Sequence, residues 1–223
     1  MFEELLKLFG KENLLDQSYK TTVKMLEADE EMFLACVNSL RKHDDSKLPF
    51  DIYEKDKKIN KYEREVRRNV LTHLTIAEDK NVGAGLVLIS IVIDVERIGD
   101  FTKNISELAV AHPARLEGGD LESILGDVEE KVQIRFRDMV KCLLEKDEVL
   151  ARQIMSDHRD ISGKCDMALN DILLGKDETL ESQDAVTLAL YIRYLKRVGA
   201  HLSNIASAIV NPFPRIGFRE KKK

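Results

Sequence analysis

The stretch that decides the fold is Asp94-Val-Glu-Arg-Ile-Gly-Asp-Phe-Thr-Lys-Asn104, which recurs one hundred residues later as Tyr194-Leu-Lys-Arg-Val-Gly-Ala-His-Leu-Ser-Asn204. The alignment runs without a gap over residues 86–110 and 186–210. Identical residues stand at Leu88/Leu188, Arg97/Arg197, Gly99/Gly199, Asn104/Asn204, Ile105/Ile205 and Val110/Val210. A match of this length predicts an internal duplication, in which the second copy has lost the acidic residues of the first.

The composition favours an all-α protein. The 223 residues include no tryptophan and only four prolines, and 34% charged residues stand beside 43% hydrophobic ones, as amphipathic helices require. A net charge of −5 argues against a nucleic acid partner, because phosphate backbones are bound by basic surfaces. Three distant cysteines, no secretory signal and no apolar run long enough to span a bilayer predict a cytoplasmic protein.

Hydrophobic periodicity predicts three helices in each half of the chain. Pro49 separates the first two, and residues 112–119 are the only plausible linker between the halves. The predicted helices cover residues 14–41, 51–74 and 84–111 in a first domain, 1–112, and residues 121–145, 148–174 and 182–211 in a second domain, 120–223. The middle helices align more weakly, as residues 54–71 on 156–173, and residues 26–30 align with 144–148.

Four polar residues of the first half form a candidate metal site. Glu96 and Asp100 are four residues apart, so their carboxylates share one helix face, and Asp56 and Asn60 form a second such pair. If the two helices pack antiparallel, their oxygen atoms can meet and hold a hard cation. Alternatively the carboxylates are solvated, with Glu96 paired to Arg97 or Lys103 and Asp56 to its adjacent lysines.

The glycine in each copy of the motif has a structural explanation. Glycine in the middle of a helix costs roughly 1 kcal/mol relative to alanine, so Gly99 and Gly199 predict a close approach of another helix. Asn104 and Asn204 are expected to be buried amides that form hydrogen bonds. Arg97 and Arg197 are retained in both copies as part of the same structural motif.

Residues 95–105 resemble the E(D)xxxD signature of the PhoU family of phosphate-uptake regulators, and residues 194–205 are similar to its second occurrence. Residues 56–60 resemble the DxxID element of that family. The resemblance implies two tandem antiparallel three-helix bundles, each able to carry a metal cluster. It also implies a cytoplasmic negative regulator that contacts a phosphate transporter, either of the ABC type or a sodium/phosphate symporter, and a sensor histidine kinase.

Carried over residue by residue, the resemblance places metal ligands in the first half only. Asp56, Glu96 and Asp100 match the acidic positions of the family, and Asn60 stands where an acid is typical. The corresponding residues of the second half are His158, Ser162, Lys196 and Ala200, which form a degenerate site. The resemblance thus implies at most one metal ion or cluster, of iron, zinc, nickel or magnesium, on the first half.

Two other functional classes stay open at this point. One is a ferritin-like carboxylate metalloenzyme, which the absence of a Glu-x-x-His element on the proposed ligand helices disfavours. The other is a helical scaffold or accessory subunit of another transporter, so we expect no catalysis. The apolar residues 1–9, and residues 212–214 with Phe218, either cap a bundle end or contact a partner or the inner face of the membrane. A homodimer is compatible with either function.

Overall fold

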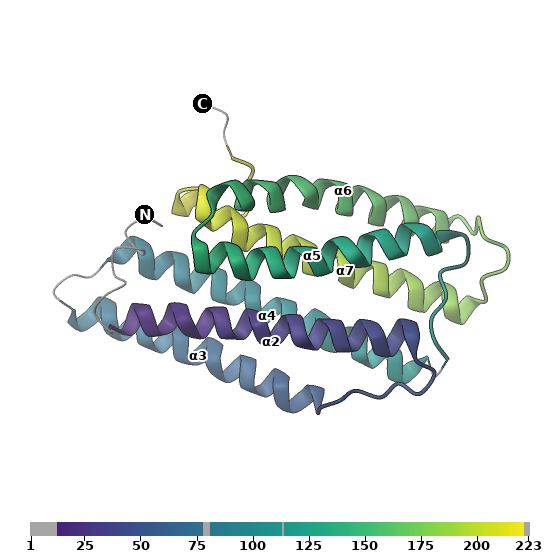
Figure 1. Ribbon diagram of the computed structural model, residues 1–223, viewed down its shortest axis with the longest axis horizontal. Helices are drawn as coiled ribbons and strands as arrows, with labels where there is room; N and C mark the ends of the chain where they lie inside the picture. Colours follow the sequence, from purple (N-terminus) through teal and green to yellow (C-terminus); the bar gives the residue numbers. More distant parts are fainter. Residues whose placement is uncertain (1–12, 78–80, 113, 221–223) are drawn as a thin grey trace.

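The computed structural model describes residues 13–77, 81–112 and 114–220, in which helices are the only regular secondary structure (Figure 1). The expected contact segment 1–9 lies outside the described residues. The elements are α2 (Leu14–Lys42), α3 (Ile52–Ile76), α4 (Val82–Ala111), α5 (Glu122–Glu145), α6 (Glu148–Leu173) and α7 (Ser182–Val210), with 3-10 turns η1 (Gly119–Leu121) and η2 (Phe213–Arg215). The all-α prediction is confirmed, and each predicted helix boundary lies within two residues of the observed one.

Local chemistry sets where several helices begin and end. The side chain of Asn13 accepts a hydrogen bond from the backbone N–H of Asp16 at the start of α2, and Asp51 caps α3 in the same way. Lys146 ends α5 in the left-handed conformation, with a φ of 64°, and Asp147 then caps α6. The turn between α5 and α6 therefore needs only two residues, whereas nine residues connect α2 to α3.

One alignment made from the sequence is wrong. Residues 26–30 lie in the middle of α2, but residues 144–148 span the end of α5, the turn and the start of α6. The two Leu-Glu-x-Asp-Glu segments therefore have different structures. An acid inside a helix and an acid that caps the next helix look alike in the sequence when the turn between helices is this short.

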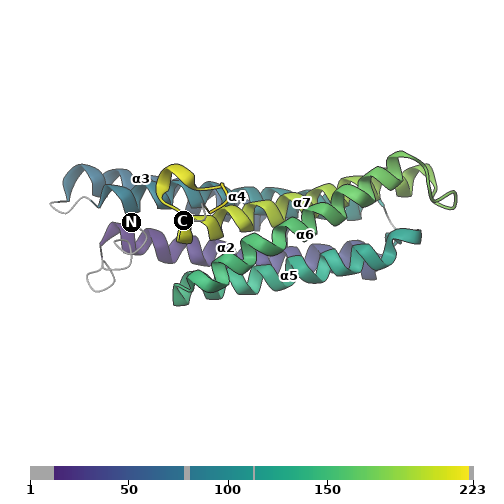
Figure 2. The same cartoon turned by 90° about the horizontal axis from the view of Figure 1, so that it is seen from above.

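The helices run along the length of the molecule in two groups of three (Figures 1 and 2). Within the groups, α2, α3 and α4 pack together, as do α5, α6 and α7. The groups meet where α4 packs on α7 and α2 packs on α5, which leaves α3 and α6 on the outer flanks. None of the described helices is long and apolar enough to cross a membrane.

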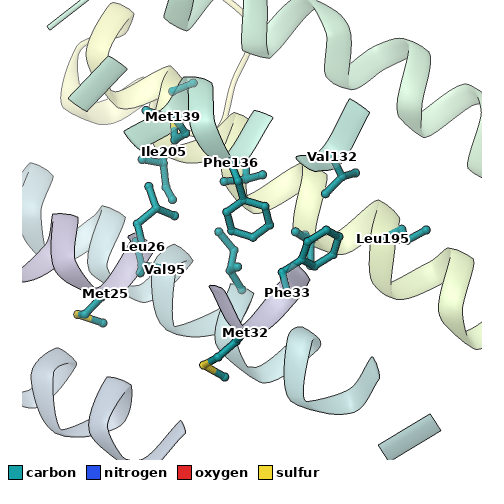
Figure 3. Packing of buried hydrophobic residues seen from close by; sticks show 14 of the residues in the cluster. Met25, Leu26, Met32, Phe33, Val95, Val132, Phe136, Met139, Leu195 and Ile205 are labelled. Carbon is teal, nitrogen blue, oxygen red and sulfur yellow. The ribbon is translucent and has the colours of Figure 1, made fainter. Parts of the chain in front are cut away.

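A single apolar core runs through both halves. The Phe33 ring of α2 lies against the Phe136 ring of α5, with 5.0 Å between centroids, and both side chains are fully buried. Figure 3 shows this pair among side chains from both halves, including Val95 of α4 and Ile205 of α7. The predicted domain boundaries stay a prediction, because the two groups of helices share one core.

The contact between α4 and α7 places the duplicated motifs side by side. His201 Nδ1 lies 2.7 Å from Asp94 Oδ1, which also accepts a hydrogen bond from Asn204 at 3.1 Å. The Phe101 and Tyr194 rings lie 6.0 Å apart. Under the hundred-residue offset, Asp94 corresponds to Tyr194 and Phe101 to His201, so one polar contact and one aromatic contact occupy equivalent places. The hydrogen bond predicted for Asn204 is confirmed, but Asn104 and Asn204 are half-buried rather than buried as predicted.

Burial supports the alignment of both the last and the middle helices. The pattern of buried, half-buried and exposed residues over 91–100 is repeated residue for residue over 191–200, and that of 54–62 is repeated over 156–164. Arg97 and Arg197 are both exposed, although only Arg197 lies over the Phe101 ring, at 5.5 Å from its centroid. The structure is therefore a duplicated fold with different side chains on equivalent faces.

Both motif glycines lie where the neighbouring helix comes close, as predicted. A Cβ atom on Gly99 would lie 2.9 Å from Asp29 Oδ1 and 3.4 Å from the Ile59 side chain. A Cβ atom on Gly199 would lie 3.4 Å from His158 Nδ1. The first half is thus the tighter of the two, and the close neighbour there is a carboxylate of α2.

Candidate functional site

The predicted ligand pairs of α3 and α4 meet across the helix contact. The ammonium group of Lys103 lies 3.1 Å from Asp56 Oδ2 on α3 and 3.1 Å from Asp100 Oδ1 on its own helix. The Asn60 amide donates to Asp56 Oδ2 at 3.3 Å, and Glu96 lies one turn before Asp100 on the same half-buried face. The structure therefore brings the four residues together around a cation that the protein itself supplies.

The ion pairs match the solvated alternative at Glu96, which lies 3.8 Å from Arg97, but differ from it at Asp56. Asp56 pairs with Lys103 of α4, whereas its neighbour Lys57 pairs with Glu54 at 2.6 Å. Arg97 reaches Asp100 only at 3.5 Å and Glu96 at 3.8 Å, and its side chain is 57% exposed. Screening by water makes such an exposed pair weak, so Lys103 is the main counter-ion of the cluster.

The donor atoms have the right chemistry for a hard cation, but their arrangement does not fit a bound metal. Carboxylate and amide oxygens are the ligands that hard divalent ions prefer. The Lys103 ammonium lies between Asp56 and Asp100, where a shared ion would have to lie. Over the described parts of the chain, no three His, Cys, Asp or Glu side chains are grouped so as to hold one ion. A metal could bind here only after Lys103 moved away.

A fourth acidic residue, Asp29 of α2, lies behind this cluster and was not predicted. Its side chain is fully buried, and neither carboxylate oxygen has a hydrogen-bond partner among the described residues. Burial raises the pKa of Asp29 well above its usual value, and the charges of Glu96, Asp56 and Asp100 raise it further. We infer that Asp29 is neutral when the carboxylates nearer the surface are charged.

The sequence contained a signal for Asp29. It lies three residues after Leu26 and four before Phe33, so it shares the helix face that those two buried residues define. A carboxylate on an apolar helix face is unusual and indicates a special environment. The mistaken alignment of this segment with residues 144–148 hid the signal.

The cluster as a whole carries excess negative charge. Burial raises the pKa of Glu96, and the neighbouring charges of Asp100 and of Glu63 on α3 raise it further. Glu63 also pairs with Arg67 at 2.8 Å. Removing Lys103 would therefore leave Asp56 without its ion pair, and the exposed Arg97 as the remaining counter-ion of Glu96 and Asp100.

The degenerate positions of the second half have different contacts. Lys196 pairs with Asp166 of α6, whereas the corresponding residues of the first half are Glu96 and Arg64. His158 lies against Gly199, and burial lowers the pKa of this imidazole, with a smaller contribution from the charge of Lys196. Ser162 and Ala200 line a groove between α6 and α7. The signs of the charges are thus exchanged between the two halves.

Comparison with known proteins places the chain in a family. A family model described as the PhoU domain matches residues 22–109 and 125–209, one segment in each half. The chain belongs to the PhoU domain family. An uncharacterized protein of Methanocaldococcus jannaschii is 26% identical over 220 residues, which span 95% of this chain and 72% of that protein.

Two solved PhoU structures share the fold. PhoU from Pseudomonas aeruginosa matches with a TM-score of 0.78 at 21% identity, covering 88% of this chain and 95% of its own. The phosphate transport system regulatory protein PhoU from Streptococcus pneumoniae matches with a TM-score of 0.69 at 17% identity, covering 88% and 91%. At these identities the likeness establishes the PhoU fold, a tandem pair of three-helix bundles. The chemistry of each face depends on the side chains that this chain carries there.

The buried Asp29 predicts a pH-dependent gain in stability for Asp29→Asn. Because the folded state holds this proton more tightly than the unfolded state does, wild-type protein loses stability as the pH rises above about 4, the ordinary pKa of aspartate, toward the folded-state pKa. The free energy of unfolding of the variant, relative to wild type, should therefore increase from pH 4 to pH 7 in urea titrations. Glu107→Gln, which removes an exposed carboxylate from α4, is the control. A difference that is constant with pH would contradict the burial of a protonated Asp29.

Lys103→Ala is predicted to convert the carboxylate cluster into a metal site. A unit charge about 4 Å from a divalent ion costs about 2 kcal/mol even at the dielectric constant of water, a factor of about thirty in affinity. Zinc and magnesium affinity, measured by calorimetry on chelator-treated protein, should rise at least tenfold in this variant and fall again in Lys103→Ala/Glu96→Ala. Lys61→Ala, which removes an exposed lysine from α3, should change nothing. Tight metal binding by wild type that persists in Glu96→Ala would refute this assignment.

Proposed function

We propose that this protein regulates phosphate uptake and phosphate homeostasis through contacts with other proteins. The PhoU domain match in both halves carries the proposal, and the shared fold with the Streptococcus pneumoniae regulatory protein supports it. The partners we propose are a phosphate transporter, of the ABC type or a sodium/phosphate symporter, and the sensor histidine kinase that responds to phosphate. The protein acts in the cytoplasm, with peripheral contact at the inner face of the membrane where the transporter lies.

The chemistry of the first half favours regulation over metal catalysis. A di-metal enzyme needs carboxylates that converge on open coordination positions, whereas Lys103 bridges Asp56 and Asp100 here. We assign no catalytic residue. Any metal site is on the first half and competes with Lys103, so metal binding would change the charge on the α3/α4 face and could modulate a partner contact.

Exposed apolar side chains at the turn between α3 and α4 are suited to a protein contact. Leu71 and Ile76 near the end of α3 are 66% and 72% exposed, and Val82 at the start of α4 is 51% exposed. These residues are close in sequence on both sides of one turn. We propose these three exposed side chains as part of a docking surface.

Deletion of the gene in its host tests the proposal. Phosphate uptake in phosphate-rich medium should rise severalfold without the protein, because a negative regulator is lost, and wild-type complementation should restore repression. Uptake is measured with labelled phosphate, and the transporter should co-purify with the tagged protein.

The docking turn is tested in the same complementation. Leu71→Glu/Ile76→Glu should weaken both repression and co-purification, whereas Val149→Glu, at a 76% exposed position on α6, should not. Unchanged uptake after deletion would refute the regulatory role, and equal effects of the two variants would refute only the docking turn.

A further inference from the structure

A groove of about 810 Å³ lies between α6 and α7. It is not one of the surfaces that we propose for regulatory contacts. Small side chains, among them Ser162, Ala200 and Ser203, form part of its lining, and the chain segment at Gly217 and beyond forms another part. The volume is in the range that binds small organic molecules and is larger than a free inorganic ion needs. The groove is therefore a candidate ligand site of the second half.

The charges that line the groove favour an anion. Arg152, Arg159 and Arg219 exceed the acidic residues Asp166 and Glu220 by one positive charge. Two residues beside the groove offset each other, since Lys196 pairs with Asp166 and Glu148 pairs with Arg152. The equivalent face of the first half carries the carboxylate cluster, so the duplicated scaffold presents opposite charge on its two halves.

Arg159 is the cation that is available to a ligand. Its guanidinium donates to Ser156 Oγ at 3.2 Å, and within the described ranges it has no ion pair with a carboxylate. A guanidinium offers several donors in one plane, which match the oxygens of a phosphoryl group, and the neighbouring serine hydroxyls can add further hydrogen bonds. His158 Nδ1 is also buried on this wall without a hydrogen-bond partner among the described residues.

An anion of the protein itself already lies against the second arginine. Arg152 Nε donates to both carboxylate oxygens of Glu220, at 2.9 Å and 3.2 Å, and its Nη2 reaches Glu148 at 2.9 Å. The tail that carries Glu220 is held in place because Gly217 N–H donates to Ser207 Oγ at 2.7 Å. Glu220 therefore occupies the position of an incoming anion and would compete with it.

We propose that the groove between α6 and α7 binds a small molecule carrying a phosphoryl group, with Arg159 and Arg152 holding the phosphoryl oxygens and Glu220 as the internal competitor. The phosphoryl group could belong to a nucleotide-sized ester or to inorganic phosphate. The groove's volume favours the ester. The site does not depend on the proposed partner contacts, so it can be tested on the isolated chain.

Calorimetric titration of the full chain with ADP and, separately, with inorganic phosphate tests the proposal. Arg159→Ala should lower the affinity for the bound probe at least tenfold, because a charge-assisted bidentate contact is lost. Lys57→Ala removes the cation at the equivalent position of the first half and should leave the affinity unchanged. Glu220→Gln should raise the affinity severalfold by removing the internal competitor.

The comparison of the two probes distinguishes a site for a phosphate ester from a site for free phosphate. Tighter binding of ADP than of phosphate, with these variant effects, supports an ester site, whereas comparable binding supports a site for free phosphate. Circular dichroism establishes that Arg159→Ala is folded, and Glu220→Gln tests the site in the opposite direction. No binding of either probe by wild type or by Glu220→Gln, or equal losses in Arg159→Ala and Lys57→Ala, would overturn the proposal.

Discussion

The packing of α4 against α7 is the contact on which the rest of the structure depends. These two helices carry the duplicated motif. Each packs against the other two helices of its own bundle and against the opposite half. Their equivalent positions are filled by the Asp94/His201 hydrogen bond on one side and the Phe101/Tyr194 ring contact on the other. The symmetry of the backbone is therefore maintained by contacts that are chemically different, which shows that the packing constrains shape more than residue identity.

This constraint leaves the outer faces free to diverge. On the first half, α3 and α4 present carboxylates, two of which contact Lys103, with the buried Asp29 behind them. On the second half, α6 and α7 present arginines, serines and the Lys196/Asp166 pair around a groove. One scaffold thus carries a carboxylate face closed by Lys103 on the first half and, on the second half, the groove that we propose as an anion site. The side chains of either face can change without a change of fold, because both faces lie on the same shared core.

The sequence predicted the features that are set locally. Helix positions, the alignment of the last helices and the close approach at the glycines follow from periodicity and from the conformational cost of glycine, so they could be inferred from single segments. The role of Lys103 could not, because the same helix face also offers Arg97 as a counter-ion, and only the packed side chains show which cation lies between Asp56 and Asp100. The groove could not be inferred either, because its lining combines α6 and α7 with the C-terminal segment, where Glu220 contacts Arg152 from 68 residues away. The burial of Asp29 was detectable on one helix face and was missed through a false alignment.

Hydrogen–deuterium exchange of the full chain with and without ADP tests most directly whether the two halves present faces of opposite charge. If the account is right, ADP slows exchange of backbone amides in α6, α7 and the segment that carries Glu220, because bound ligand reduces local opening there. Exchange in α3 and at the start of the motif in α4 stays unchanged, since the carboxylate face repels the anion. Protection that is equal in the two halves, or confined to α3 and α4, would contradict the account.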